Sequence, residues 1–157
     1  MCIEGLHNWW YQRQHGIGKP EISGQVNSTV INETVNAELD CNVYCSDHFY
    51  SMANWNEFNR MIEWDKTNQL PYSADGTEGS FDCDDFAKRL AGAFAIPYWS
   101  GLPFGELLVT APSPLGAHKV NIFVDENLSV WIVEPQDDST YRKSDLGGWE
   151  YHYAEFS

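Results

Sequence analysis

Three residues of the chain, Cys83, His118 and Glu134, have the types and the order that thiol catalysis needs. A cysteine becomes a nucleophile when a neighbouring base takes its proton, and an acceptor on the far side of the base holds that base in place. Histidine and glutamate suit these two roles. The hypothesis is a triad in which Cys83 attacks, His118 acts as general base and then general acid, and Glu134 orients the imidazole.

The nucleophile needs an element to hold it, and the sequence predicts a helix over about residues 82–95. Apolar side chains recur there every four residues on one helical face: Phe86, Leu90 and Phe94. A thiol in the first turn of a helix faces the positive end of the helix dipole, which stabilises a thiolate. Taken alone, Cys83 also fits the commoner case of a small buried side chain without a chemical role.

The other two residues are predicted on the strands of a hairpin. Residues 118–124 and 128–134 are rich in β-branched side chains and flank a short polar turn at 125–127. His118 opens the first strand and Glu134 closes the second, so antiparallel pairing sets them side by side. Separately, a strand histidine or a solvated glutamate needs no catalytic role. Together with a helix cysteine, they follow the papain-type order.

The sequence around these positions resembles a known family. Phe81-Asp-Cys-Asp-Asp-Phe-Ala87, the strand after His118 and Trp131-Ile-Val-Glu-Pro-Gln136 are similar to a cysteine-protease domain. That domain follows the lectin domain in MOA-related fungal agglutinins, and stand-alone versions occur in phage and bacterial sequences. The resemblance covers residues 40–138 and implies a papain-like fold with a Cys–His–Glu triad at the three positions named above. It does not extend to the carbohydrate-binding trefoil, because the chain is too short and shows no repeats.

The predicted fold class is α+β, papain-like or transglutaminase-like, with the cysteine at the N-terminus of a helix packed against an antiparallel sheet. Residues 1–38 are expected to form an N-terminal arm, and residues 39–157 a single compact catalytic domain. Within the arm, Trp9, Trp10 and Tyr11 are expected to pack onto the main body.

Further elements follow from spacing and β-branched content. Scattered β-branched residues suggest one or two strands within 21–40, and apolar residues at three- and four-residue spacing predict a helix over 47–66. A loop with proline and glycine is expected over 69–80. Shorter strands are expected at 107–109 and over 149–153.

Aspartates crowd the cysteine at positions 82, 84 and 85. Their like charge opposes a thiolate and so works against the helix dipole. A hard cation bound by Asp82, Asp84 and Asp85 would remove this conflict, and the family resemblance also implies calcium dependence. Alternatively, these carboxylates are solvated or pair with Lys88, Arg89 or backbone amides. No EF-hand pattern supports calcium independently, and the triad itself requires no cofactor.

The second donor of an oxyanion hole is less clear from the sequence. Papain-like enzymes place a glutamine a few residues before the cysteine, whereas residues 76–78 here are Gly, Thr and Glu. The backbone N–H of Cys83 can serve as one donor. The candidates for the second donor are Gln69, the nearest upstream glutamine, and Gln136.

A second group of possible metal ligands is Cys41, Cys45 and His48. Two thiols and an imidazole within eight residues suit zinc, with Asp40 or Asp47 as a fourth ligand. No second Cys or His pair follows at finger-like spacing, so packed or surface thiols are the favoured interpretation. A disulfide between the two cysteines is the further alternative for a protein that leaves the cell.

Composition limits the class of partner. The formal net charge is −14 with only 9 Lys and Arg residues, which disfavours nucleic acid and anionic membranes as partners. The charge suits a cation, a basic substrate or high salt. No apolar run approaches the ~20 residues of a membrane span, and the first residues lack the basic and apolar segments of a signal peptide. We therefore expect a soluble protein that is cytoplasmic by default.

The main functional hypothesis is a thiol hydrolase, a peptidase or amidase, that acts on a peptide or protein substrate. A close variant is a transglutaminase-like acyl transferase, in which an amine replaces water. The alternative from another class is a binding or structural protein, including a viral one, that keeps the fold with a weak or silent site.

Overall fold

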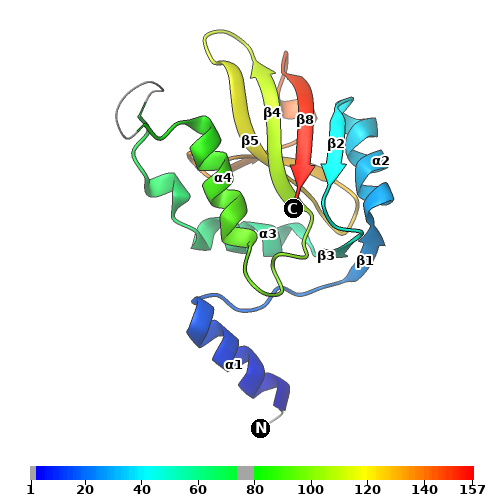
Figure 1. Cartoon of the computed structure of the whole chain (residues 1–157), viewed down its shortest axis with the longest axis vertical. Coiled ribbons are helices and arrows are strands. Elements are labelled where there is room, and N and C mark those ends of the chain that lie inside the picture. The colour runs from blue at the N-terminus through cyan, green and yellow to red at the C-terminus, as the bar shows by residue number, and fades with distance from the viewer. Residues whose placement is uncertain (1–2, 74–79) are drawn as a thin grey trace.

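The protein has an α+β fold, as predicted, and the computed structural model describes residues 3–73 and 80–157 (Figure 1). One sheet has the strand order β2-β8-β4-β5-β6-β7. Its strands are β2 (Asn42–Cys45), β4 (Phe104–Ala111), β5 (Gly116–Val124), β6 (Val130–Glu134), β7 (Ser139–Tyr141) and β8 (Glu150–Phe156). The pairing is antiparallel except between β2 and β8. A separate antiparallel pair joins β1 (Gly24–Asn27) to β3 (Phe49–Met52).

Helices lie on both sides of this sheet (Figure 1). The described helices are α1 (Ile3–His15), α2 (Ser28–Leu39), α3 (Trp55–Trp64) and α4 (Cys83–Phe94), with short 3-10 helices η1 (Thr67–Gln69) and η2 (Lys143–Asp145). Of these, α1 does not lie on the sheet but projects away from it (Figure 1). Within the described residues, no helix is both long enough and apolar enough to cross a bilayer.

The two faces of the sheet contact different helices, because side chains of a strand point alternately to opposite faces. In β5, Val120 and Ile122 pack into one core cluster with residues of α2, so we call this side the α2 face. Phe123 packs into a second cluster with residues of α3 and α4, so we call the other side the α4 face. Asn121 shares the α4 face and donates to a carbonyl of α4.

Helix α4 runs in the same direction as β5. The buried amide of Asn121 donates to the carbonyl of Ala87 at 2.8 Å, near the start of the helix. At the other end, the ring of Phe94 stacks on Phe104 with centroids 3.7 Å apart, and Phe104 pairs with Phe123 of β5. The N-terminus of α4 therefore points toward the first residues of β5.

Several predicted elements are confirmed. The helix predicted over 82–95 is α4, and its face of Phe86, Leu90 and Phe94 is buried. The predicted hairpin is β5 with β6, and the strands predicted at 107–109 and 149–153 correspond to β4 and β8. In each case the apolar pattern is dense, so burial and local preference agree.

The helix predicted over 47–66 is wrong in its first half. Residues 49–52 form β3, which pairs with β1, and the helix begins only at Trp55. The side chain of Asn54 caps α3 by accepting from the N–H of Glu57 at 3.2 Å. The three- and four-residue spacing of apolar residues runs from β3 into α3, so the sequence suggests one helix. Residues 49–52 form a strand instead because they pair with β1, which is distant in sequence.

The strands predicted within 21–40 are also largely wrong. Only β1 is a strand, and residues 28–39 form α2. The Asn27 side chain caps this helix, accepting from the N–H of Val30 at 3.1 Å. Buried residues of α2 recur every four positions: Ile31, Val35 and Leu39. Because they belong to the sheet core, that core extends into the segment expected to be an arm.

At the N-terminus, only one of three aromatic residues packs as expected. Tyr11 is buried and its hydroxyl donates to the carbonyl of Pro97 at 2.5 Å. Trp9 and Trp10 are 54% and 65% exposed. Figure 1 shows α1 projecting away from the sheet, which explains why these indoles lack a surface to cover.

A polar contact ties η1 to the turn between β6 and β7. The amide of Asn68 donates to Oδ2 of Asp138 at 2.6 Å. Burial, followed by the charges of Asp65 and Asp137, raises the pKa of Asp138 to about 6. Asp138 has φ of +63°, a conformation that aspartate and asparagine tolerate better than most residues.

We predict that Asn121→Ala lowers the free energy of unfolding by about 1–3 kcal/mol, since two buried carbonyls, of Ala87 and Gly105, lose their donor. Urea denaturation measures the change. The exposed Asn127→Ala is the matched control and should stay within about 0.5 kcal/mol. Equal losses in the two variants would show that Asn121 does not hold α4 on the sheet.

We predict that Asp138→Asn makes stability less dependent on pH. A carboxyl whose pKa is raised in the folded state contributes stability below its unfolded pKa of about 3.9, and that contribution is lost as pH rises through about 6. Between pH 4 and 7, the stability of the variant relative to that of the wild type should therefore rise. The side-chain amide oxygen of the variant can still accept a hydrogen bond from Asn68. Thermal unfolding across this range tests it. Parallel curves for both proteins contradict the assignment.

Candidate active site

The structure joins two of the three residues of the hypothetical triad. Nε2 of His118 lies 2.7 Å from Oε2 of Glu134, within hydrogen-bonding distance. The two residues come from neighbouring strands, β5 and β6, whose ladder ends at the pair of Asn121 and Val133, next to Glu134 and three residues from His118. The side chain of His118 is only 8% exposed and that of Glu134 20%, so the pair is largely shielded from water.

Further contacts fix the pair. The other carboxylate oxygen of Glu134, Oε1, accepts from the backbone N–H of Gln136 at 3.3 Å. The indole of Trp149 meets the imidazole edge-on, with centroids 6.0 Å apart. When Nε2–H donates to the carboxylate, the neutral ring carries its proton there, and Nδ1 is the nitrogen that accepts a proton. Trp149 was expected in a strand and lies just before β8, so the sequence pattern did not indicate this contact.

Cys83 is the first residue of α4 and is half-buried. A capping box holds this end: the Asp82 side chain accepts from the N–H of Asp84, and the Asp85 side chain accepts from the N–H of Asp82, both at 3.3 Å. At 100° per residue, Cys83 falls on the same helical side as the buried Ala87 and the rest of the sheet-facing row. Cys83 therefore lies at the N-terminus of α4, on the side of the helix that faces the sheet.

By strand alternation the pair projects toward the α2 face, whereas helix α4, whose first residue is Cys83, packs on the α4 face. His118 has the same parity as Val120, and Glu134 the same as Ile132, so the pair lies on the α2 face. Helix α4 covers the α4 face, where the neighbouring Lys119 is close enough to lower the pKa of Asp84 slightly. Among the described residues, no hydrogen bond joins Cys83 to His118.

The three aspartates around the thiol are close together. One carboxylate oxygen each from Asp82, Asp84 and Asp85 lies within 4.8 Å of the others. Asp84 also pairs with Lys88 at 2.5 Å, and its hydrogen bond with Asp82 followed by this ion pair lowers its pKa. Backbone amides and a lysine thus satisfy part of the cluster, which was the alternative to a cation.

The two candidate oxyanion donors have different positions. Gln136 lies half-buried in the turn after Glu134, whereas Gln69 ends η1 and is exposed. Residues 76–78, which occupy the place of the papain glutamine, lie outside the described residues.

The proposed zinc ligands do not meet. Cys41 is buried in the sheet core, Cys45 is half-buried with its thiol 3.8 Å from the carbonyl of Ser28, and His48 is exposed. Burial raises the pKa of both thiols, which disfavours metal-binding thiolates. Cys41, Cys45 and Cys83 are all free thiols, so the alternative disulfide does not form here.

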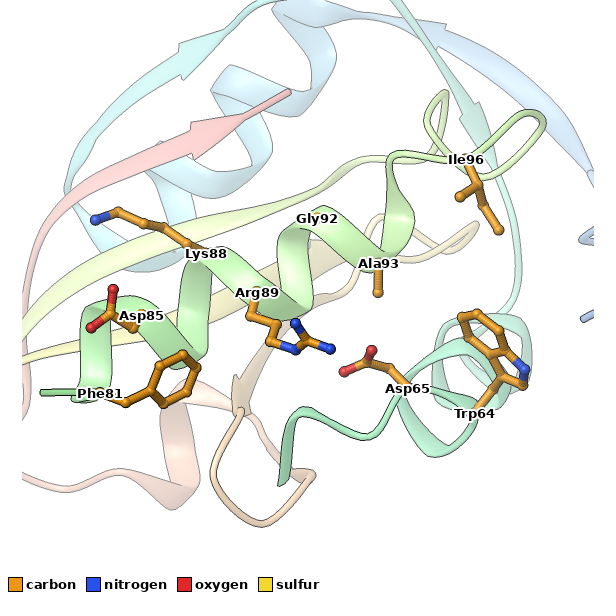
Figure 2. A pocket seen from close by; sticks show the side chains of 9 residues that line it. All are labelled: Trp64, Asp65, Phe81, Asp85, Lys88, Arg89, Gly92, Ala93 and Ile96. Carbon is orange, nitrogen blue, oxygen red and sulfur yellow. The ribbon is translucent and has the colours of Figure 1, made fainter. Parts of the chain in front are cut away.

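Two hollows flank these elements. A pocket of about 580 Å³ lies on the outward side of α4, between that helix and the end of α3, and Figure 2 shows Arg89 and Asp65 pointing toward each other in it. Its α4 residues are on the helical side opposite Cys83. The second pocket, about 220 Å³, includes Glu134 in its wall and is therefore the one next to the polar pair.

We predict that the Glu134 carboxylate fixes the imidazole tautomer. When the ring is neutral, long-range ¹H–¹⁵N spectra should show His118 with its proton on Nε2. Glu134→Ala should release this preference and lower the free energy of unfolding by about 1–3 kcal/mol, because a buried ring nitrogen loses its partner. Glu134→Gln retains an acceptor and should preserve the tautomer. An Nδ1–H tautomer in the wild type would contradict the assignment.

Comparisons with known proteins support the fold. No protein-family model and no curated protein matches the chain. Among solved structures, the chain is similar to PSL1a in the PSL1a–E64 complex (TM-score 0.68, 23% identity, 84% of this chain and 51% of that chain). It is equally similar to the lectin of Polyporus squamosus bound to the human-type influenza-binding epitope Neu5Aca2-6Galb1-4GlcNAc (TM-score 0.68, 22% identity, 84% and 49%).

LapG of Legionella pneumophila aligns less well, with a TM-score of 0.44 and 16% identity over 60% of this chain and 59% of that chain. The chain spans about half the length of PSL1a and of the Polyporus squamosus lectin chain. The resemblance to MOA-related agglutinins expected from the sequence is thus confirmed at the level of the fold, which the chain shares with part of the Polyporus squamosus lectin.

Proposed function

We propose that the protein is a papain-like thiol hydrolase that cleaves an amide bond in a peptide or protein. The observation that carries the proposal is the shielded hydrogen bond between Nε2 of His118 and Glu134, which prepares an imidazole to accept a proton at Nδ1. The position of Cys83 at the N-terminus of α4 supplies the matching nucleophile.

In this proposal His118 takes the thiol proton, and the Cys83 sulfur attacks the amide carbonyl carbon. The backbone N–H of Cys83 and a second donor, for which Gln69 and Gln136 are the candidates, stabilise the oxyanion. The imidazolium then protonates the leaving amine, and water hydrolyses the thioester with His118 again as base. Glu134 holds the ring throughout.

The proposal sets a geometric condition. The imidazole has to reach the thiol from the α2 face, which requires the first residues of β5 to turn toward α4 when substrate binds. At its start, before Asn121, β5 pairs with β4 but, among the described residues, not with β6, so this end of the strand has fewer hydrogen bonds to hold it. Catalytic hydrogen bonds often form only in the substrate complex.

The proposal includes a calcium ion bound by the three aspartates around Cys83. A cation on Asp82, Asp84 and Asp85 would offset the negative charge beside the thiolate. The residues fit a hard cation through their oxygen atoms. Activity should therefore rise with added calcium and fall with a chelator if the cluster has this role.

The second candidate is a binding or structural protein that keeps the fold with a silent site. The specific observations in its favour are that His118 and helix α4 belong to opposite faces of the sheet and that, among the described residues, no hydrogen bond joins His118 to Cys83. The similarity to lectin structures is compatible with a binding role, although it concerns the fold alone.

Thiol labelling separates the candidates. At pH 6, iodoacetamide should modify Cys83 at least about tenfold faster than Cys41 or Cys45, since burial raises the pKa of those two thiols. The variant His118→Ala should reduce the Cys83 rate to that of an ordinary thiol. Mass spectrometry of tryptic peptides reads out each site.

The activity measurement uses fluorescently labelled casein with and without a primary amine. Hydrolysis that Cys83→Ser abolishes supports the hydrolase, and incorporation of the amine identifies the acyl-transferase variant. Slow labelling of Cys83, unchanged in His118→Ala, together with no turnover would leave the silent-site candidate.

A further inference from the structure

The pocket beside Glu134 combines an apolar wall with a single charge. Its volume is about 220 Å³, the size of one side chain rather than of a peptide. Aliphatic side chains from β5, β6 and two loops form most of the wall: Leu115, Val120, Ile132 and Leu146. Tyr141 and Trp149 add two aromatic rings, and among the described residues Glu134 is the one charged residue that lines it.

Glu134 has capacity for a further donor. A carboxylate offers about four acceptor positions, and the contacts with His118 and the N–H of Gln136 use two of them. Its side chain is 20% exposed against 8% for His118, so the carboxylate is the more accessible partner of the pair. A donor that enters the pocket therefore meets Glu134.

The positive side chains nearest in sequence are engaged elsewhere. The guanidinium of Arg142 lies 4.9 Å from the ring centroid of Trp131 and 4.0 Å from a carboxylate oxygen of Glu38. Lys143 donates to the carbonyl of Glu38 at 2.6 Å. Neither residue lines the pocket, so among the described residues no Lys or Arg side chain lies in its wall beside Glu134.

We propose that this pocket binds a primary ammonium group carried on an unbranched aliphatic stem, as in a lysine side chain or a free alkylamine. The stem packs against the aliphatic wall, the ammonium donates to Glu134, and the aromatic rings of Tyr141 and Trp149 favour the positive charge. The net charge of −14 favours the approach of such a cation. Binding requires no thiol chemistry and therefore goes beyond the proposed hydrolase.

The test uses n-butylammonium chloride as the probe and n-butanol as its neutral isostere, at constant ionic strength. The indole N–H resonance of Trp149, assigned with Trp149→Phe, reports on binding. The expected result is a saturable shift with butylammonium and at least about tenfold weaker binding of butanol, consistent with a charge-assisted hydrogen bond. Equal dissociation constants, or no saturable shift, overturn the proposal.

Three variants sharpen the result. Glu134→Gln should remove the preference for the charged probe, and Leu146→Trp should block the pocket while leaving the His118–Glu134 pair intact. Cys83→Ser should bind butylammonium as the wild type does, which keeps this test separate from that of the hydrolase. Preference for charge that survives in Glu134→Gln contradicts the assigned partner. Urea denaturation confirms that each variant is folded.

A second probe, N-acetyl-lysine N-methylamide, distinguishes the two sources of the ammonium group. Binding comparable to butylammonium indicates a lysine side chain of a polypeptide. Binding of butylammonium alone indicates a small free amine, because the backbone of the lysine derivative then does not fit past Leu115 and Trp149.

Discussion

Side chains of β5 alternate between two environments, and this alternation constrains everything the molecule can do with His118. Asn121 on one face anchors α4 through the carbonyl of Ala87, while Val120 on the other face packs with α2. Because the period of a strand is two, His118 has to share the side of Val120. The same constraint pairs the imidazole with Glu134 and separates it from the helix that carries Cys83.

Two features at the start of α4 have opposite electrostatic effects on a thiolate at Cys83. The helix N-terminus favours a thiolate, whereas Asp82, Asp84 and Asp85 oppose one. The capping box shows that two of these carboxylates have a structural task, since they satisfy backbone N–H groups of the first turn. The aspartates therefore stabilise the helix whether or not the cysteine reacts, and their abundance alone is no evidence for a cation site.

Sequence patterns predicted the parts of the fold in which local preference and burial coincide. Helix α4 and the β5–β6 hairpin show dense apolar spacing, and the order of Cys83, His118 and Glu134 followed from them. Helix α2 was missed because β-branched residues outweighed the cap at Asn27, although Ile31, Val35 and Leu39 have helical spacing. The sequence could not predict on which face of the sheet a given side chain lies. A shift of one residue in the strand register reverses the face, and the register depends on strands that are distant in sequence.

The most direct test of the account is a crystal structure of the protein alkylated at Cys83 by an amide-like electrophile. In a thiol hydrolase, the start of β5 should turn so that Nδ1 of His118 lies about 3–4 Å from the Cys83 sulfur, with Nε2 still bonded to Glu134. An imidazole that stays on the α2 face, well beyond about 6 Å from the sulfur, would contradict the catalytic role of the pair.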